Sequence, residues 1–174
     1  GLPVLREHGF PSVTFVVPDA MSGVVGFSWY PDGETPPLAG WDELRAEEAA
    51  GLARFEPHTI THPVLTSLTR EAARAEIAGS KTIVERELGR EARIFCYPGG
   101  YYSAREVELV RECGFRAAVT CEFGANHAPF DHGQLRRTIV ERSDAPWLFR
   151  ARLNGATDTP PPGRRRRCGE QLAA

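Results

Sequence analysis

The feature that most constrains the fold is an alternation of strand-like and helix-like segments. Short runs of β-branched and aromatic residues have the composition of buried strands; they are SVTFVV (12–17), 52–55, 93–97, AAVT (117–120) and LRRTIV (135–140). Segments with apolar residues at helical spacing lie between and after them; they are 41–50, 69–88, 103–113 and 143–153. This alternation predicts parallel strands with helices packed outside, as either a barrel or an open sheet.

Local signals mark the ends of two helices and one long loop. Gly89 directly follows 69–88 and matches a C′ glycine, and Ser103 and Glu106 form a capping box at the start of the next helix. The charged residues of 69–88 are expected to form a solvated face. Residues 18–40 hold many Gly and Pro without periodicity, which predicts a long loop. The sequence leaves open whether this loop is a lid or binding loop or whether its aromatic residues pack against the body of the domain.

The length and composition suit a single domain. A chain of 174 residues with 41% apolar residues buries a core without crosslinks. We expect this domain to comprise residues 1–155. The remainder, 156–174, is poor in apolar residues and carries four consecutive arginines, so it is predicted to be a disordered tail.

The balance of charge and hydropathy argues against two classes of partner. A net charge of -2 and a pI near 6.2 produce no field that would gather nucleic acid or an anionic membrane. No apolar run approaches the ~20 residues of a membrane span. We therefore expect neither a nucleic-acid partner nor a membrane span, and the sequence leaves localisation and oligomeric state open.

The sharpest chemical signal is PHTITHP (57–63), where His58 and His62 lie four residues apart just after a strand. On a helical turn this spacing puts both imidazoles on one face, as two ligands of one zinc-like ion require. Two surface histidines at this spacing also arise by chance. The pattern alone therefore suggests a metal site without establishing one.

Several separated segments resemble the polysaccharide deacetylase family, carbohydrate esterase family four or NodB homology domain, in order and spacing. They are HTITHP with the helix after it, FCYPGGYYS (95–103), GFRAAVT (114–120) and LRRTIVERSD (135–144). The resemblance covers about residues 1–154. It implies a distorted (β/α) barrel with its site at the strand carboxyl ends. It also implies hydrolysis of acetyl or other acyl groups from amide nitrogen, usually on N-acetylglucosamine polymers and in some relatives on small amides.

The resemblance assigns roles to particular residues. His58 and His62 match two metal ligands, most often of zinc, and a divalent ion would activate water and polarise the acyl carbonyl. Gly99 follows the proline of FCYPGG and would offer its N–H to the developing oxyanion. Arg136 and Arg137 point to opposite faces of a strand, so one alone faces the site. We assign Arg137 as the catalytic candidate, because the family's leaving-group histidine is absent from LRRTIV.

Aromatic residues carry the substrate prediction. Trp29 in the long loop, and Tyr97 and Tyr101 in FCYPGGYYS, are the candidate substrate-binding residues, with a carbohydrate as the partner. A rival reading is a non-catalytic carbohydrate-binding relative that stacks sugar rings on Trp29, Tyr30, Tyr101 and Tyr102.

The largest departure from the family concerns its first motif, Thr-Phe-Asp-Asp-Gly, whose aspartates are the base and the third metal ligand. The 174 residues contain no Asp-Asp pair. The opening GLPVLREHG reads as the end of a helix closed by Gly9, so we expect an N-terminally incomplete barrel that is inactive as given. Asp19, after a strand, is the one stand-in worth testing. Cys96 occupies the place where many members carry an arginine.

Overall fold

The structure is a computed structural model, and it describes residues 1–27, 29–30 and 35–158. These described residues form four strands, which run parallel in two pairs. In the first pair β1 (Ser12–Val16) lies beside β2 (Ala53–Pro57), with Ser12 opposite Ala53. In the second pair β3 (Ile94–Cys96) lies beside β4 (Ala117–Val119). Strands that follow one another through helices and run parallel match the predicted α/β class.

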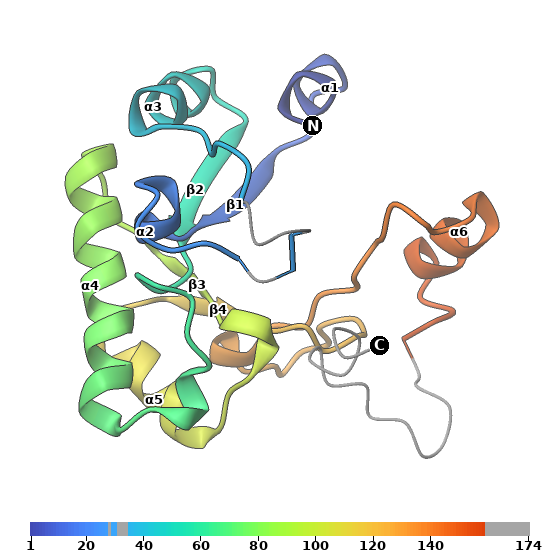
Figure 1. The fold of residues 1–174 in the computed structure, drawn as a ribbon. Helices are drawn as coiled ribbons and strands as arrows, with labels where there is room; N and C mark the ends of the chain where they lie inside the picture. Colours follow the sequence, from blue (N-terminus) through green and yellow to red (C-terminus); the bar gives the residue numbers. More distant parts are fainter. Residues whose placement is uncertain (28, 31–34, 159–174) are drawn as a thin grey trace.

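Helices cover one side of these strands (Figure 1). The α-helices are α1 (Leu2–Glu7), α2 (Pro18–Met21), α3 (Trp41–Ala49), α4 (Arg70–Leu88), α5 (Ala104–Glu112) and α6 (Pro146–Leu153), and the 3₁₀ turns are η2 (Leu65–Ser67), η3 (Pro98–Gly100) and η4 (His132–Gln134). The apolar sides of α4 and α5 and the strands enclose the core, which includes Phe55, Leu65, Ile77, Phe95 and Leu109. Among the described residues no helix is both long and apolar enough to cross a membrane.

The two central helices begin and end where the sequence predicts. Thr69 caps α4 by accepting a hydrogen bond from the Ala72 N–H, and Gly89 ends it in the left-handed conformation. Ser103 and Glu106 form the expected capping box of α5. These ends depend on contacts within a few residues, which the sequence makes visible.

Two strand predictions need correction. LRRTIV forms a single parallel bridge, Leu135 to Val119, instead of a strand. The N–H groups of Arg136 and Arg137 are not available to a neighbouring strand, because they donate to the Asn126 side chain and to the Glu122 carbonyl in the preceding loop. SVTFVV has the composition of a buried strand, yet Val13 is 43% exposed, and α1, the helix before this strand, has no buried residue.

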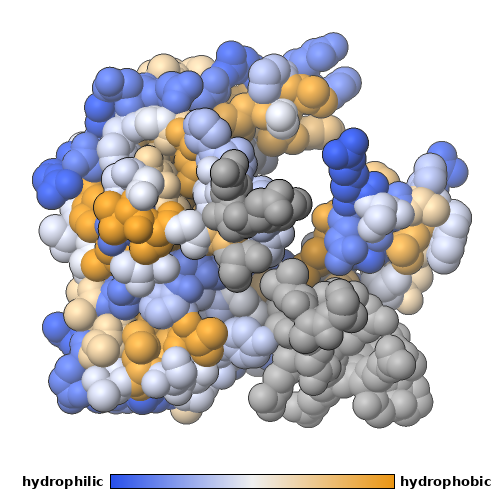
Figure 2. Space-filling view, viewed as in Figure 1, coloured by the Kyte–Doolittle hydropathy of each residue, from blue (hydrophilic) through white to orange (hydrophobic). Residues whose placement is uncertain are grey.

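The C-terminal helix α6 stands apart from the strands in the ribbon and in the space-filling view (Figures 1 and 2). None of its residues is buried, and Trp147 and Leu153 are 71% and 68% exposed. Of the predicted tail 156–174, residues 159–174 lie outside the described residues, so that prediction stays open.

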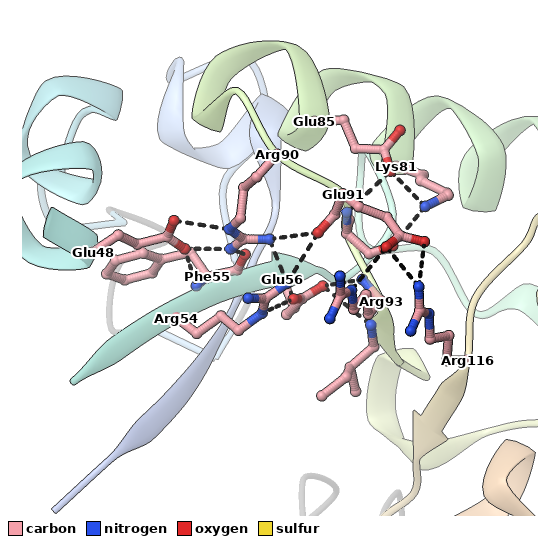
Figure 3. A network of polar contacts seen from close by, with 12 residues as sticks. Glu48, Arg54, Phe55, Glu56, Lys81, Glu85, Arg90, Glu91, Arg93 and Arg116 are labelled. Carbon is pink, nitrogen blue, oxygen red and sulfur yellow. Dashed lines mark hydrogen bonds and ion pairs between the residues drawn. The ribbon is translucent and has the colours of Figure 1, made fainter. Parts of the chain in front are cut away.

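Along β2 and at the amino end of β3, a network of charged side chains links strands and helices (Figure 3). Glu56 of β2 is fully buried and accepts from the Arg54 and Arg90 side chains. Glu48 of α3 accepts from Arg90 and from the Phe55 N–H. This network joins α3, β2 and the start of β3.

The Glu48 carboxylate is expected to make the free energy of unfolding depend on pH. Burial acts to raise the pKa of Glu48, but hydrogen bonds from Arg90 and Phe55 and the charge of Arg90 outweigh it, so the pKa is lowered below its usual 4.5. A carboxylate whose pKa is lower in the folded than in the unfolded protein stabilises the fold at pH values above its unfolded pKa. This contribution is lost as the pH falls through its folded pKa. Glu48→Gln should therefore cost about 1 kcal/mol near neutral pH and less in acid.

Urea unfolding of the wild-type chain and Glu48→Gln at neutral and acidic pH measures this difference. Glu71→Gln, an exposed position on α4, is the control and should change little at either pH. A destabilisation by Glu48→Gln that is the same at both pH values would contradict the proposed linkage.

Candidate active site

The predicted site residues converge at the carboxyl ends of the strands. His58 directly follows β2, and its N–H donates to the Val16 carbonyl at the end of β1, at 2.9 Å. The His58 Nδ1 lies 2.7 Å from the Cys96 carbonyl at the end of β3. Three strand ends therefore meet around one imidazole, in the position where parallel α/β folds place their sites.

His58 and His62 lie side by side, with ring centroids 4.8 Å apart and ring planes at 72°. The predicted conformation is wrong, since residues 58–62 form an irregular loop and not a helical turn. Thr59 and His62 have φ values of 65° and 63°, which no helical turn contains. The two imidazoles are brought together by this left-handed geometry instead of by helical spacing.

The electrostatic setting keeps both imidazoles neutral near neutral pH. Burial lowers the pKa of His58 to about 4 against the opposing hydrogen bond to Cys96, and the charges of His62 and Arg137 lower it further. Burial also lowers the pKa of His62. Because Nδ1 of His58 is engaged by Cys96, only its Nε2 can bind another group. A neutral imidazole oriented by a carbonyl is the usual state of a metal-binding histidine.

The loop between the histidines is held by hydrogen bonds that the sequence shows only in part. The Thr59 hydroxyl accepts from the His62 N–H at 3.0 Å. The Glu76 carboxylate of α4 accepts from Ile60, from Thr61 and from the Thr61 hydroxyl. Sequence reasoning missed Glu76, because the polar side of α4 was expected to face solvent.

Gly99 lies in η3, which follows β3, with φ 59°. A Cβ at this position would sit 2.8 Å from Cδ2 and Cε2 of Tyr101, so the turn requires glycine. Among the described residues its N–H donates to no other group, whereas the neighbouring Gly100 and Tyr101 N–H groups close the turn. This leaves the Gly99 N–H available to an oxygen atom, with the Tyr101 side chain beside it.

Arg137 is half-buried while Arg136 is exposed. The Arg137 Nε donates to the Thr120 carbonyl at 2.8 Å, and Nη2 lies 3.2 Å from the Cys96 Sγ. Its guanidinium carbon is 5.5 Å from the centre of the Phe15 ring on β1. Its positive charge helps to lower the pKa of His58, which is lowered mainly by burial, and its guanidinium contacts the side chain of Cys96, whose carbonyl holds the imidazole.

The predicted aromatic residues divide into two groups. Trp29 is 45% exposed, stacks on Phe27 at 4.3 Å, and its ring centre lies 5.2 Å from that of His62. Phe27 itself lies 5.5 Å from His62, and sequence reasoning missed it because the loop has no periodicity. Tyr97 is fully buried and its hydroxyl donates to the Gly133 carbonyl, so its assignment to substrate binding is wrong.

The histidines fit part of a metal ligand set. A zinc site needs at least three protein ligands with a fourth position open for catalysis. In the part of the chain that the structure describes, no group of three His, Cys, Asp or Glu side chains is arranged to hold an ion. Asp19 lies at the start of α2 and its N–H donates to the Ile60 carbonyl, but its carboxylate belongs to no such group.

The family model of the polysaccharide deacetylases matches residues 1–118. The Streptococcus pyogenes deacetylase PplD in complex with acetate is 18% identical with a TM-score of 0.74, and the match covers 91% of this chain and 63% of that one. A CE4 family pseudoenzyme from Bacillus anthracis is 14% identical with a TM-score of 0.53, covering 67% and 36%. These likenesses confirm the expected (β/α)-type fold.

Among curated proteins, one from Moorella thermoacetica named orotidine 5'-phosphate decarboxylase is 37% identical over 100 residues, 54% of this chain and 38% of that protein. That share is too small to transfer the named activity. The chain thus spans less than two thirds of the length of this relative and of PplD. Because the family model covers more than half of the residues, the chain belongs to the polysaccharide deacetylase family.

Proposed function

We propose that this site takes part in metal-dependent hydrolysis of the acetamide group of N-acetylated sugars or polysaccharides. The observation that carries the proposal is the pair of imidazoles, 4.8 Å apart, at the strand carboxyl ends of a polysaccharide deacetylase fold. His58 and His62 would hold a divalent ion, most suitably zinc, whose chemistry is to activate water and polarise the acyl carbonyl.

The surrounding residues would bind and orient the substrate. The Gly99 N–H would donate to the oxygen atom that gains charge as the acyl carbon is attacked. Trp29 and Phe27 would pack against a sugar ring beside His62, and Tyr101 would border the acyl group. Arg137 would favour negative charge near His58, because its guanidinium lies 3.2 Å from the Sγ of Cys96, the residue whose carbonyl holds the imidazole.

The proposed site is incomplete within these 174 residues. They contain no Asp-Asp pair, and two histidines supply too few ligands for tight zinc binding. Among the described residues no carboxylate is grouped with the two histidines as a further metal ligand. We therefore expect the chain by itself to bind zinc weakly and to hydrolyse little or no substrate.

A second candidate function is carbohydrate binding without catalysis. It is favoured by the exposed stack of Trp29 on Phe27, together with the likeness to the CE4 family pseudoenzyme. A hydrolase of small non-peptide amides is the remaining alternative. It would use the same histidines and Gly99, with no need for the aromatic stack.

Zinc titration of the 174-residue chain tests the role of the histidines. Near neutral pH, saturable zinc binding should be lost or weakened by at least about tenfold in His58→Ala and in His62→Ala. His127→Ala, at an exposed loop histidine, is the matched control and should bind zinc like the wild type. Calorimetry measures the affinity, and histidine NMR signals show which imidazoles respond. Wild-type affinity in both histidine variants would reject the metal assignment.

A further inference from the structure

The histidine loop, residues 58–62, has a backbone that its own sequence does not favour. Thr59 and His62 both have positive φ, and Thr59 is β-branched, a residue type for which this region is a genuine outlier. Such conformations persist only where the surrounding structure fixes them. The loop therefore requires an external support, and its neighbours show what supplies it.

That support is the side chain of Glu76, in the middle of α4. Its Oε2 accepts from the N–H groups of Ile60 and Thr61 at 2.8 and 3.1 Å, and its Oε1 accepts from the Thr61 hydroxyl at 2.8 Å. All three donors belong to the loop, in residues that lie between His58 and His62 in the sequence. Hydrogen bonds to an ionised carboxylate are about twice as strong as neutral ones.

Other glutamates of α4 form ion pairs with Lys or Arg side chains, whereas Glu76 forms none with the described residues. Glu85 pairs with Lys81, and Glu87 pairs with Arg86 and Arg45. Within the described residues Glu76 forms no ion pair, so its negative charge is directed to the loop. A typical surface glutamate of a helix would instead be solvated or paired with a cation.

A second contact places α4 close to the same loop. Gly79 lies three residues after Glu76 and so faces the same side of the helix. A Cβ at Gly79 would sit 2.5 Å from Cδ1 and 3.4 Å from Cγ1 of Ile60. The missing side chain lets Ile60 approach the helix, which brings its N–H within reach of the Glu76 carboxylate.

We propose that Glu76 is a positioning residue that holds the histidine loop in its left-handed conformation, so that the imidazoles of His58 and His62 face one point. The identity of the ion at that point rests on the proposed function. Glu76 acts through the backbone of Ile60 and Thr61 and does not touch substrate or metal.

The first test uses the metal-free chain and measures amide hydrogen exchange. In Glu76→Ala, exchange at Ile60 and Thr61 should become about tenfold faster or more, since charge-assisted hydrogen bonds are lost. Exchange at core amides such as Phe95 should stay unchanged. Glu76→Gln keeps one acceptor oxygen and should give a smaller effect, and Glu71→Ala, exposed on the same helix, should give none.

The second test asks whether the imidazoles follow the loop. Histidine side-chain NMR signals of His58 and His62 should shift in metal-free Glu76→Ala, and zinc affinity should fall by about tenfold to a hundredfold. Thr61→Val, which removes one donor, should lower the affinity less than Glu76→Ala. In the double variant the two losses should not add, because both changes break the same contact.

The outcomes separate this inference from the proposed function. Unchanged exchange at Ile60 and Thr61 in Glu76→Ala, or faster exchange with unshifted imidazole signals, would overturn the positioning role. Equal acceleration of loop and core amides would overturn it too, because a general loss of stability would then explain the effect. If the metal-free results appear as expected but the wild-type chain binds no zinc, positioning by Glu76 is supported and the metal assignment fails.

Discussion

Placing an Asp-Asp-bearing strand ahead of Gly1 is expected to raise acetate release from N-acetylglucosamine oligomers by about 10²–10⁴-fold over the 174-residue chain. The reason is that a carboxylate base would then assist the attack of water, and a charged third ligand would strengthen the Lewis acid. Among the described residues His58 and His62 are joined by no such carboxylate.

The measurement is acetate release by both forms at equal concentration, with zinc or cobalt supplied, and with and without a chelator. The matched control carries Asn-Asn in place of Asp-Asp, which keeps the added strand and removes its charge. Chelator-sensitive release by the 174-residue chain at the rate of the longer form would refute the missing-carboxylate argument. Asp19 or a carboxylate from a second copy would then be the base to test.

The same experiment separates the rival functions. A folded, metal-loaded form with the Asp-Asp pair that is inactive on both polymeric and small amides would favour carbohydrate binding. Oligosaccharide binding should in that case weaken in Trp29→Ala, because the exposed stack on Phe27 would be removed. Activity confined to small amides would favour the remaining alternative.

Glu56→Ala is expected to be the most damaging substitution for stability, at about 3–5 kcal/mol. The Glu56 carboxylate is fully buried and accepts from the N–H groups of Arg93 and Ile94 at 2.8 and 3.1 Å. It also accepts hydrogen bonds from the Arg54 and Arg90 guanidinium groups (Figure 3). Alanine would leave two backbone donors unsatisfied at the start of β3 and two cations without this partner.

Glu91 offers a matched control in the same network. It pairs with Arg93 and Arg116, but its side chain is 42% exposed, so Glu91→Ala should cost less than about 1 kcal/mol. Urea unfolding of both variants measures the difference. Similar losses for Glu56→Ala and Glu91→Ala would show that burial of the Glu56 carboxylate is not what gives the network its stability.

The sequence by itself determined the elements whose signals are local. Apolar spacing with Thr69 and Gly89 at its ends predicted a helix over 69–88, and the structure has Arg70–Leu88. The alternation of strands and helices predicted the α/β class, and the spacing of HTITHP and FCYPGG led to the family. These signals are visible in sequence because caps, turns and periodicity depend on residues a few positions apart.

The tertiary structure alone decided how the site is built. The contact of Glu76 with Ile60 spans 16 positions and that of His58 with Cys96 spans 38, and neither leaves a periodic trace in the sequence. The wrong helical turn for HTITHP follows from this, because its backbone is fixed by α4 and by strand ends instead of by local preference. Tyr97 was misassigned for the same reason, since burial depends on Tyr102 and Gly133, which pack against it only after the chain has folded.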